Sequence, residues 1–167
     1  MQKPTHISGD GSISMVDVSE KGASARNARA EAVVRMSPAA ARALREATLP
    51  KGDAFVAAQL AGILAAKQTA ALIPLAHPLP LSSVDVRFEW IADGTLRVEA
   101  QARTVGQTGV EMEAMVAASI AALTIYDMSK ALDRGIAIES VRLLEKSGGK
   151  SGRWTRSAGA EERDERV

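Results

Sequence analysis

Apolar and charged residues alternate with a period of two along residues 84–90 and again along residues 96–102, which is typical of half-buried β-strands. Asp93 and Gly94 lie between the two segments and are a common hairpin-turn pair. Apolar runs at residues 30–36 and 136–144 predict two further strands. The alternating apolar residues are Val84, Val86, Phe88 and Trp90 in the first segment and Leu96, Val98, Ala100 and Ala102 in the second.

Two long stretches between these strands have helical signals. Asp53 is a good N-cap for a helix that we expect to run to about residue 72, before the proline-rich loop at residues 74–80. A second long helix is expected from about residue 110 to residue 132. Ser37, followed by Pro38, predicts a short helix as well. The alanines of both long helices would allow close packing and leave a second surface to bury, which favours self-association.

The predicted order is strand, helix, strand, strand, helix, strand. This is the split βαβ order of an α+β, ferredoxin-like fold, in which two long helices pack on one face of an antiparallel four-stranded sheet. We expect a single domain over residues 1–156, with residues 1–29 as a mobile arm and residues 157–167 as a disordered tail.

Composition narrows the classes of function. The chain of 167 residues has 31 alanines and five aromatic residues, which argues against an all-β protein. It has no cysteine, so disulfides, thiolate zinc sites and cysteine nucleophiles are excluded. No apolar run is long enough for a membrane span and no signal peptide is evident, so we expect a cytoplasmic protein. The net charge of +1 argues against a broad nucleic-acid surface.

Several polar residues at the ends of the predicted elements are candidates for chemistry, each beside a plainer structural interpretation. Lys51 lies just before the start of a helix, where it and the free backbone N–H groups would suit an anion. The alternative is a capped turn with a solvated lysine. His77 is fixed among three prolines, as a clamp or as a structural hydrogen-bonding group. Asp127 and Lys130 are three residues apart on an otherwise apolar helix, where they are either a partly buried acid and base or a surface ion pair. Lys67 is likewise a charged residue within the otherwise apolar first long helix.

Two glycine-containing runs are also candidates. Glu111 and Glu113 are at the start of a helix but two residues apart, so they cannot both face one site through the helix alone. The plainer interpretation of either residue is a favourable interaction with the helix dipole. Residues 146–152 are rich in lysine and glycine, which suits phosphate binding or a flexible basic loop. They do not match a P-loop, because Leu144 stands where a glycine is needed and no helix follows. No zinc or calcium ligand spacing is present.

Taken together, these stretches resemble the cyclic pyranopterin monophosphate synthase (MoaC) family of molybdenum cofactor biosynthesis. The resemblance covers about residues 4–154. Its motifs, in chain order, are Met15-Val-Asp-Val-Ser19, Lys51-Gly-Asp53, Ala61-Gly-Ile63 with Ala65-Ala-Lys67, Ile73-Pro-Leu-Ala-His-Pro-Leu79, Thr108-Gly-Val-Glu-Met-Glu-Ala114, Leu123-Thr-Ile-Tyr-Asp-Met128 and Lys146-Ser-Gly-Gly-Lys-Ser-Gly152.

The resemblance implies a lyase that converts 3′,8-cyclo-7,8-dihydroguanosine 5′-triphosphate into cyclic pyranopterin monophosphate and diphosphate. A radical S-adenosylmethionine enzyme would supply the substrate. The family is ferredoxin-like and hexameric, a trimer of dimers with the active site at a dimer interface. No cofactor is required. Mg²⁺ is expected only as a companion of the triphosphate, and the sequence shows no site for it.

The resemblance also assigns residues to roles. Asp127 matches the catalytic aspartate, and Lys51 and Lys130 match lysines that act with it. Asp17 and Lys21 match the mobile N-terminal segment of the family, and Arg26 matches it less closely. Ala76 and Ser129 stand where the family usually has cysteine, so the side chain of residue 76 is no nucleophile in this chain. The residues that match substrate contacts are Asp17, Lys21, Lys67, Leu75, Ala76, His77, Met112, Glu113, Lys146 and Lys150.

Two other classes of function stay open at this stage. A ferredoxin-like module could bind a small effector without turnover, and fold alone does not separate the two. A nucleic-acid binder could use the basic stretch at residues 142–156, although Trp154 is its one aromatic residue.

Overall fold

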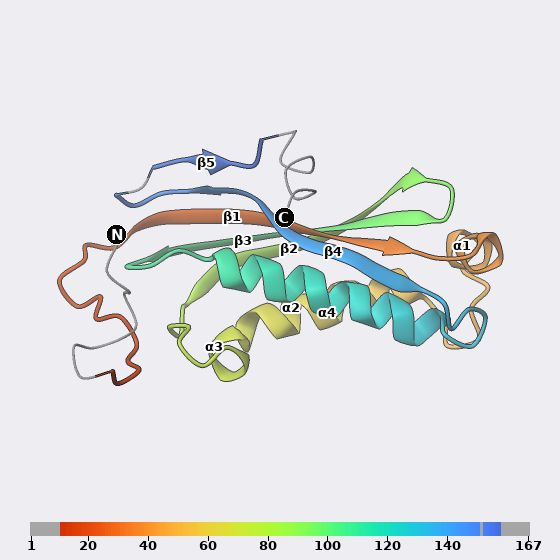
Figure 1. The fold of residues 1–167 in the computed structure, drawn as a ribbon, viewed down its shortest axis with the longest axis horizontal. Coiled ribbons are helices and arrows are strands. Elements are labelled where there is room, and N and C mark those ends of the chain that lie inside the picture. The colour runs from red at the N-terminus through yellow and green to blue at the C-terminus, as the bar shows by residue number, and fades with distance from the viewer. Residues whose placement is uncertain (1–10, 151, 158–167) are drawn as a thin grey trace.

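The computed structural model describes residues 11–150 and 152–157, which form one antiparallel sheet with helices on one face (Figure 1). The strands are β1 (Ser24–Arg35), β2 (Leu81–Ala92), β3 (Thr95–Gly106), β4 (Ala137–Ser147) and β5 (Trp154–Thr155), and the helices are α1 (Pro38–Arg45), α2 (Ala54–Lys67), α3 (Thr69–Leu72) and α4 (Glu111–Ser129).

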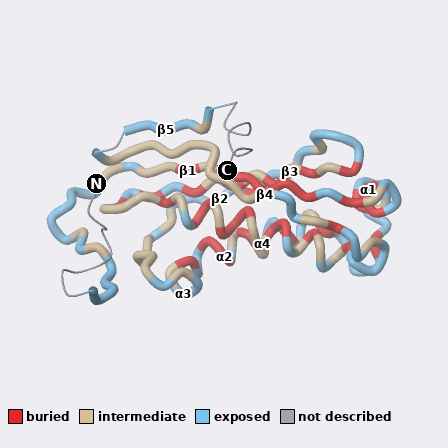
Figure 2. Tube along the Cα trace, viewed as in Figure 1, coloured by how far each residue is buried: buried red, intermediate tan, exposed pale blue. Residues whose placement is uncertain are grey.

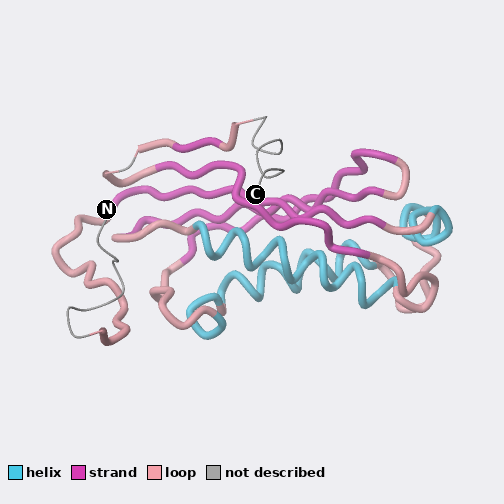
Figure 3. The backbone as a smooth tube through the Cα atoms, in the orientation of Figure 1, coloured by secondary structure: helices cyan, strands magenta, loops and turns pink. Residues whose placement is uncertain are grey.

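The sheet order is β2-β3-β1-β4-β5, and all neighbouring strands are antiparallel. The first four strands therefore have the ferredoxin-like order, which confirms the predicted fold class. Both long helices, α2 and α4, lie on the same side of the strands (Figure 3). The hairpin turn between β2 and β3 is confirmed as well, with Gly94 at a φ of 72° that a side chain would make unfavourable.

The core lies between the sheet and the long helices, where buried residues concentrate (Figure 2). Ala28, Ala30 and Ala32 of β1 are fully buried, because alternate residues of a strand point to the same face. Small residues let the helices approach closely. A Cβ added at Gly62 of α2 would stand 2.9 Å from the backbone oxygen of Ala117 in α4.

The opposite face of the sheet carries charged side chains rather than a second layer. Glu31, on the alternate positions of β1, is only 2% exposed, because two arginines cover it. Arg97 and Arg142 approach its carboxylate at 2.9 and 2.6 Å. Paired charges of this kind let an uncovered sheet face contact water.

Two predicted boundaries are wrong. β1 begins at Ser24, so residues 24–29 belong to the sheet and not to an arm. These six residues are small or polar, without a period-two pattern, and they lack the apolar signal of a strand. The first long helix ends at Lys67, where Gln68 leaves helical geometry, and α3 follows as a separate turn.

The sheet also has a fifth strand. β5 pairs with Glu145 and Lys146 of β4, and Arg156 continues the contact by donating its backbone N–H to the oxygen of Leu144 at 2.8 Å. Two residues are too few to produce a periodic signal in the sequence. The predicted tail, apart from residue 157, and the first ten residues lie outside the described residues. Within the described part of the chain, no helix has the length and apolar character needed to cross a bilayer.

Candidate functional site

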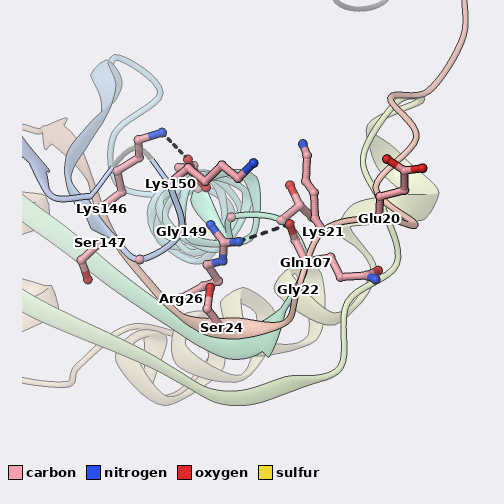
Figure 4. A pocket seen from close by; sticks show the side chains of 14 residues that line it. Glu20, Lys21, Gly22, Ser24, Arg26, Gln107, Lys146, Ser147, Gly149 and Lys150 are labelled. Atoms are coloured by element: carbon pink, nitrogen blue, oxygen red, sulfur yellow. Dashed lines mark hydrogen bonds and ion pairs between the residues drawn. The ribbon is translucent and has the colours of Figure 1, made fainter.

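A cavity of about 630 Å³ opens beside the N-terminal end of α4 (Figure 4). Three separate parts of the chain form it: the segment at residues 20–26, the loop at residues 107–111, and the end of β4 with its following turn at residues 146–150. We call it the first cavity. Its basic residues are Lys21, Arg26, Lys146 and Lys150, and its acidic residues are Glu20 and Glu111.

Hydrogen bonds fix the walls of the first cavity. Lys146 forms an ion pair with Glu111 at 2.8 Å. Arg26 donates from Nε to the oxygen of Gly106 at 3.3 Å and from Nη2 to the oxygen of Gln107 at 3.2 Å. Gly149, at a φ of 71°, packs against the same guanidinium so closely that a Cβ would collide with it. Arg26 thus joins the loop before α4 to the turn after β4.

A second cavity, of about 490 Å³, adjoins the first one and shares Lys21, Thr108, Gly109 and Glu111 with it. Its lining is more apolar, and it includes the loop after α3. The other residues that line this second cavity are Val16, Val18, Leu75, Ala76, His77, Leu79, Met112 and Glu113.

Two side chains give the second cavity its polar character. The Nε2 atom of His77 lies 2.8 Å from the backbone oxygen of Val16, and because a carbonyl only accepts, this nitrogen carries the proton. Glu113 is 3% exposed. Burial raises the pKa of Glu113 above its ordinary value, and the neighbouring Glu111 carboxylate raises it further. The site therefore holds a nearly desolvated carboxyl group next to a fixed imidazole.

A separate cluster of charges lies near the C-terminal end of α4; we call it the Asp127 cluster. Lys130 approaches the Asp127 carboxylate at 2.6 Å, and Lys51 approaches it at 2.8 Å. Lys51 also donates to the backbone oxygen of Asp127 at 3.0 Å. All three side chains are about half exposed.

The two lysines hold Asp127 in its ionised form. The hydrogen bond from Lys130, followed by that from Lys51, lowers the pKa of Asp127 from 3.8 to about 2. In turn, the hydrogen bond to Asp127 raises the pKa of Lys130. At neutral pH the cluster is thus an ionised carboxylate held between two lysine side chains.

The cavities and the Asp127 cluster are far apart within one chain. Glu113 and Asp127 are separated by 14 residues of the continuous helix α4, which is about 21 Å at roughly 1.5 Å per residue. α2 runs antiparallel to α4, because Gly62 lies against Ala117 while Lys51, before α2, reaches Asp127.

Most of the predicted site residues fall into these two groups. Lys67 ends α2 at the other end from Lys51, is exposed, and lines neither cavity. Asp17 is exposed between two cavity residues and accepts hydrogen bonds from the backbone and hydroxyl of Ser19, which lower the pKa of Asp17. Lys51, Asp127 and Lys130 form the distant cluster, and the cavities contain Lys21, Leu75, Ala76, His77, Met112, Glu113, Lys146 and Lys150.

The start of α4 supplies two carboxylates to one cavity. Glu111 and Glu113 line the second cavity together because other segments of the chain complete it around the end of α4. Glu111 was not among the predicted substrate contacts, yet it lines both cavities and pairs with Lys146. Val16, Val18, Gln107 and Thr108 also line the cavities, and their residue types alone give no functional signal.

The two positions that depart from the family pattern have different surroundings. Ala76 lines the second cavity, where its backbone N–H donates to the oxygen of Ile73 at 3.0 Å. Ser129 is fully buried, and its hydroxyl has no hydrogen-bond partner among the described residues.

Comparison with known families agrees with this geometry. The model of the MoaC family matches residues 15–149, which is more than half of the chain and includes both cavities except Lys150, as well as the Asp127 cluster. No group of three or more carboxylate or histidine side chains that could hold a metal ion occurs among residues 11–150 and 152–157.

Proposed function

The chain belongs to the MoaC family, which acts in molybdenum cofactor biosynthesis, and we propose that it converts 3′,8-cyclo-7,8-dihydroguanosine 5′-triphosphate into cyclic pyranopterin monophosphate and diphosphate. The observation that carries this proposal is the pair of adjoining cavities, one basic and one largely apolar. A nucleotide-derived triphosphate has the same two parts, a charged chain and a flat polar ring.

The basic cavity suits the triphosphate. Lys146 and Lys150 come from the end of β4 and its turn, and Lys21 reaches in from the N-terminal segment (Figure 4). Ammonium groups offset the charge of phosphate oxygens and donate hydrogen bonds to them. We assign Lys146, Lys150 and Lys21 to phosphate binding.

The second cavity suits the ring. Leu75, Ala76 and Met112 contact its faces, while Glu113 and His77 provide the polar groups that orient it. The purine-derived ring presents N–H donors on one edge, and a carboxyl group accepts from two such donors at once. A desolvated carboxyl at this point therefore favours a base of that pattern.

Proton transfers at the ring need an acid and a base in addition to the groups that orient the ring. We assign them to the Asp127 cluster, in which Asp127, coupled to Lys130, shuttles protons at the ring and Lys51 acts as acid or electrostatic stabiliser. In the final step a hydroxyl oxygen of the sugar-derived part attacks the α-phosphorus. The bond from that phosphorus to the leaving diphosphate breaks, and nearby lysines stabilise the growing negative charge.

Because the two groups of residues are about 21 Å apart along α4, this assignment requires a second copy of the chain. The outer side of the helix pair suits such a partner. Val56, Leu60 and Leu64 recur every four residues on α2 and are 59%, 59% and 48% exposed, and Leu123 of α4 is 53% exposed. A two-fold axis near the middle of the helices would bring the end of one α4 to the beginning of the other.

We therefore propose a dimer in which each site combines the cavities of one protomer with the Asp127 cluster of its partner. Assembly of three such dimers into a hexamer is the corresponding proposal for the complete particle. Light scattering of the purified protein would measure the mass of the assembly directly, and a monomer at working concentration would contradict both.

A turnover assay tests the reaction. The purified chain is supplied with the cyclised GTP derivative, and diphosphate and cyclic pyranopterin monophosphate are quantified. Asp127→Asn and Lys51→Ala should lower turnover by about 10²- to 10⁴-fold, the usual contribution of acid–base groups. Asp85→Asn is the matched control, because Asp85 is also an exposed, ion-paired aspartate but lies on β2.

The outcomes separate the enzyme from a binding module. Product from the unaltered chain and from the control, but not from the two variants, supports the proposed reaction. Saturable binding of the substrate without any product would instead favour a non-catalytic nucleotide-binding module. Turnover within about threefold of the unaltered chain in Asp127→Asn would contradict the role of that residue.

A further inference from the structure

Glu111 stands at the junction of the two cavities, with a negative charge where the proposed ligand is also negative. It lines both cavities and pairs with Lys146 at 2.8 Å. Both side chains are about one-third exposed, so the pair is neither fully solvated nor sealed off. In Figure 4 a dashed line marks the contact of the Lys146 ammonium group, and Lys150 and Lys21 are drawn on the same cavity.

The basic groups of the first cavity differ in what they already contact. Arg26 donates to the carbonyls of Gly106 and Gln107, which are neutral partners. Lys146 has a full negative partner in Glu111. A phosphate that binds Lys146 must therefore displace the Glu111 carboxylate or lie beside it, and both options cost free energy because like charges repel at short range.

We propose that Glu111 is a positioning residue that competes with phosphate for Lys146 and so limits how tightly the first cavity holds polyphosphate anions. The proposal rests on the proposed function, in which diphosphate is a product that must leave. In the free enzyme Glu111 holds the Lys146 ammonium at the cavity wall. After the reaction the same carboxylate recaptures the lysine and weakens the hold on diphosphate.

This role differs from the ordinary benefit of an acidic residue in the first turn of a helix. Favourable interaction of Glu111 with the α4 dipole would affect the stability of the fold and would not favour anion release. It also differs from a role in substrate attraction, because loss of an attractive group weakens binding. Competition predicts the opposite sign, namely that removal of the charge tightens anion binding.

The test is calorimetric titration of the full-length protein with inorganic diphosphate, in buffer without divalent cations. Glu111→Gln keeps the shape of the side chain and removes its charge. We expect it to bind diphosphate about tenfold more tightly than the unaltered chain, a difference of about 1.4 kcal/mol. Circular dichroism melting of each variant verifies that the fold is retained.

Two comparison variants make the result specific. Glu20→Gln removes a charge from the wall of the same cavity, but no ion pair of Glu20 is present among the described residues, so it should change the affinity by less than about threefold. In the double variant Glu111→Gln with Lys146→Gln, the tightening should disappear relative to Lys146→Gln alone, because the contested lysine is gone.

Unchanged or weakened diphosphate binding in Glu111→Gln would overturn the proposal, as would equal tightening in Glu20→Gln or an absence of diphosphate binding in every chain. These titrations do not depend on turnover. A chain that makes no product yet shows the predicted tightening would contradict the proposed reaction while leaving the role of Glu111 intact. In an active chain, Glu111→Gln should also become about tenfold more sensitive to inhibition by added diphosphate.

Discussion

Mixing two inactive variants should restore activity if the site is shared between protomers. Asp127→Asn disables the cluster at one end of α4, and Glu113→Gln disables the cavity at the other end. Both changes keep the shape of the side chain, so neither opens a void. Since the two positions are about 21 Å apart on one rigid helix, a single chain cannot bring both to the same substrate.

The expected recovery can be worked out from symmetry. The proposed dimer has two sites, and each would take Asp127 from one protomer and Glu113 from the other. In a hybrid dimer of the two variants, one site contains both intact residues and the other contains both substitutions. Random pairing of equal amounts makes half of the dimers hybrid, so about 25% of all sites are intact and turnover should recover to about 25% of the unaltered enzyme.

The assay is turnover of the cyclised GTP derivative after the two variants are co-expressed with different affinity tags. Each variant expressed alone provides the baseline. Purification through both tags enriches hybrids and should raise the recovery to about 50% for isolated dimers. His77→Ala, which changes another residue of the second cavity, should complement Asp127→Asn in the same way. Recovery no greater than the baseline, from hybrids that are demonstrably formed, would refute the shared site.

Three further predictions concern single residues. A carbon-detected NMR titration should give Asp127 a pKa of about 2, and Lys130→Met should move that pKa back toward 3.8. Because folding lowers this pKa, the ion pairs of Asp127 stabilise the fold above pH 3.8, and that stabilisation is lost as the pH falls toward 2. Gly62→Ala should destabilise the protein by about 1 kcal/mol in urea unfolding, because the clash with the backbone of Ala117 outweighs the gain in helix propensity; a more stable variant would contradict this. Ser129→Ala should stabilise the fold by about 1 kcal/mol, since it removes a buried hydroxyl without a partner, and a lower melting temperature would show that the hydroxyl is satisfied.

The sequence predicted strands, turns and helix starts correctly where the signal is carried by a few neighbouring residues. The alternation in β2 and β3, the Asp93-Gly94 turn and the Ser37 cap all act over a few residues, and each was confirmed. The first part of β1 was not predicted, because its polar residues pair with β3 through the backbone and such pairing gives no periodic pattern of side chains. β5 was not predicted either, because it pairs with β4 through only two residues.

The family resemblance supplied the identities of the candidate site residues but not their arrangement. It was confirmed at the level of the family, whereas the roles of individual residues stay predictions. Glu111 shows the difference most clearly. Spacing on an isolated helix separates it from Glu113 by about 200°, but the loop after α3 and the loop before α4 meet at the helix end and place both carboxylates on one cavity.

By itself, the sequence determined the fold class, the positions of the two long helices and the set of charged residues available for chemistry, because propensity, capping and periodicity are local properties of the chain. Only the tertiary structure decided which of those residues meet. Two ion pairs show this, Lys51 with Asp127 and Lys146 with Glu111. The partners are far apart in the chain and come together because α2 and β4 both pack against α4. The same packing divides the candidate residues between the two ends of α4, because a continuous helix keeps its ends apart.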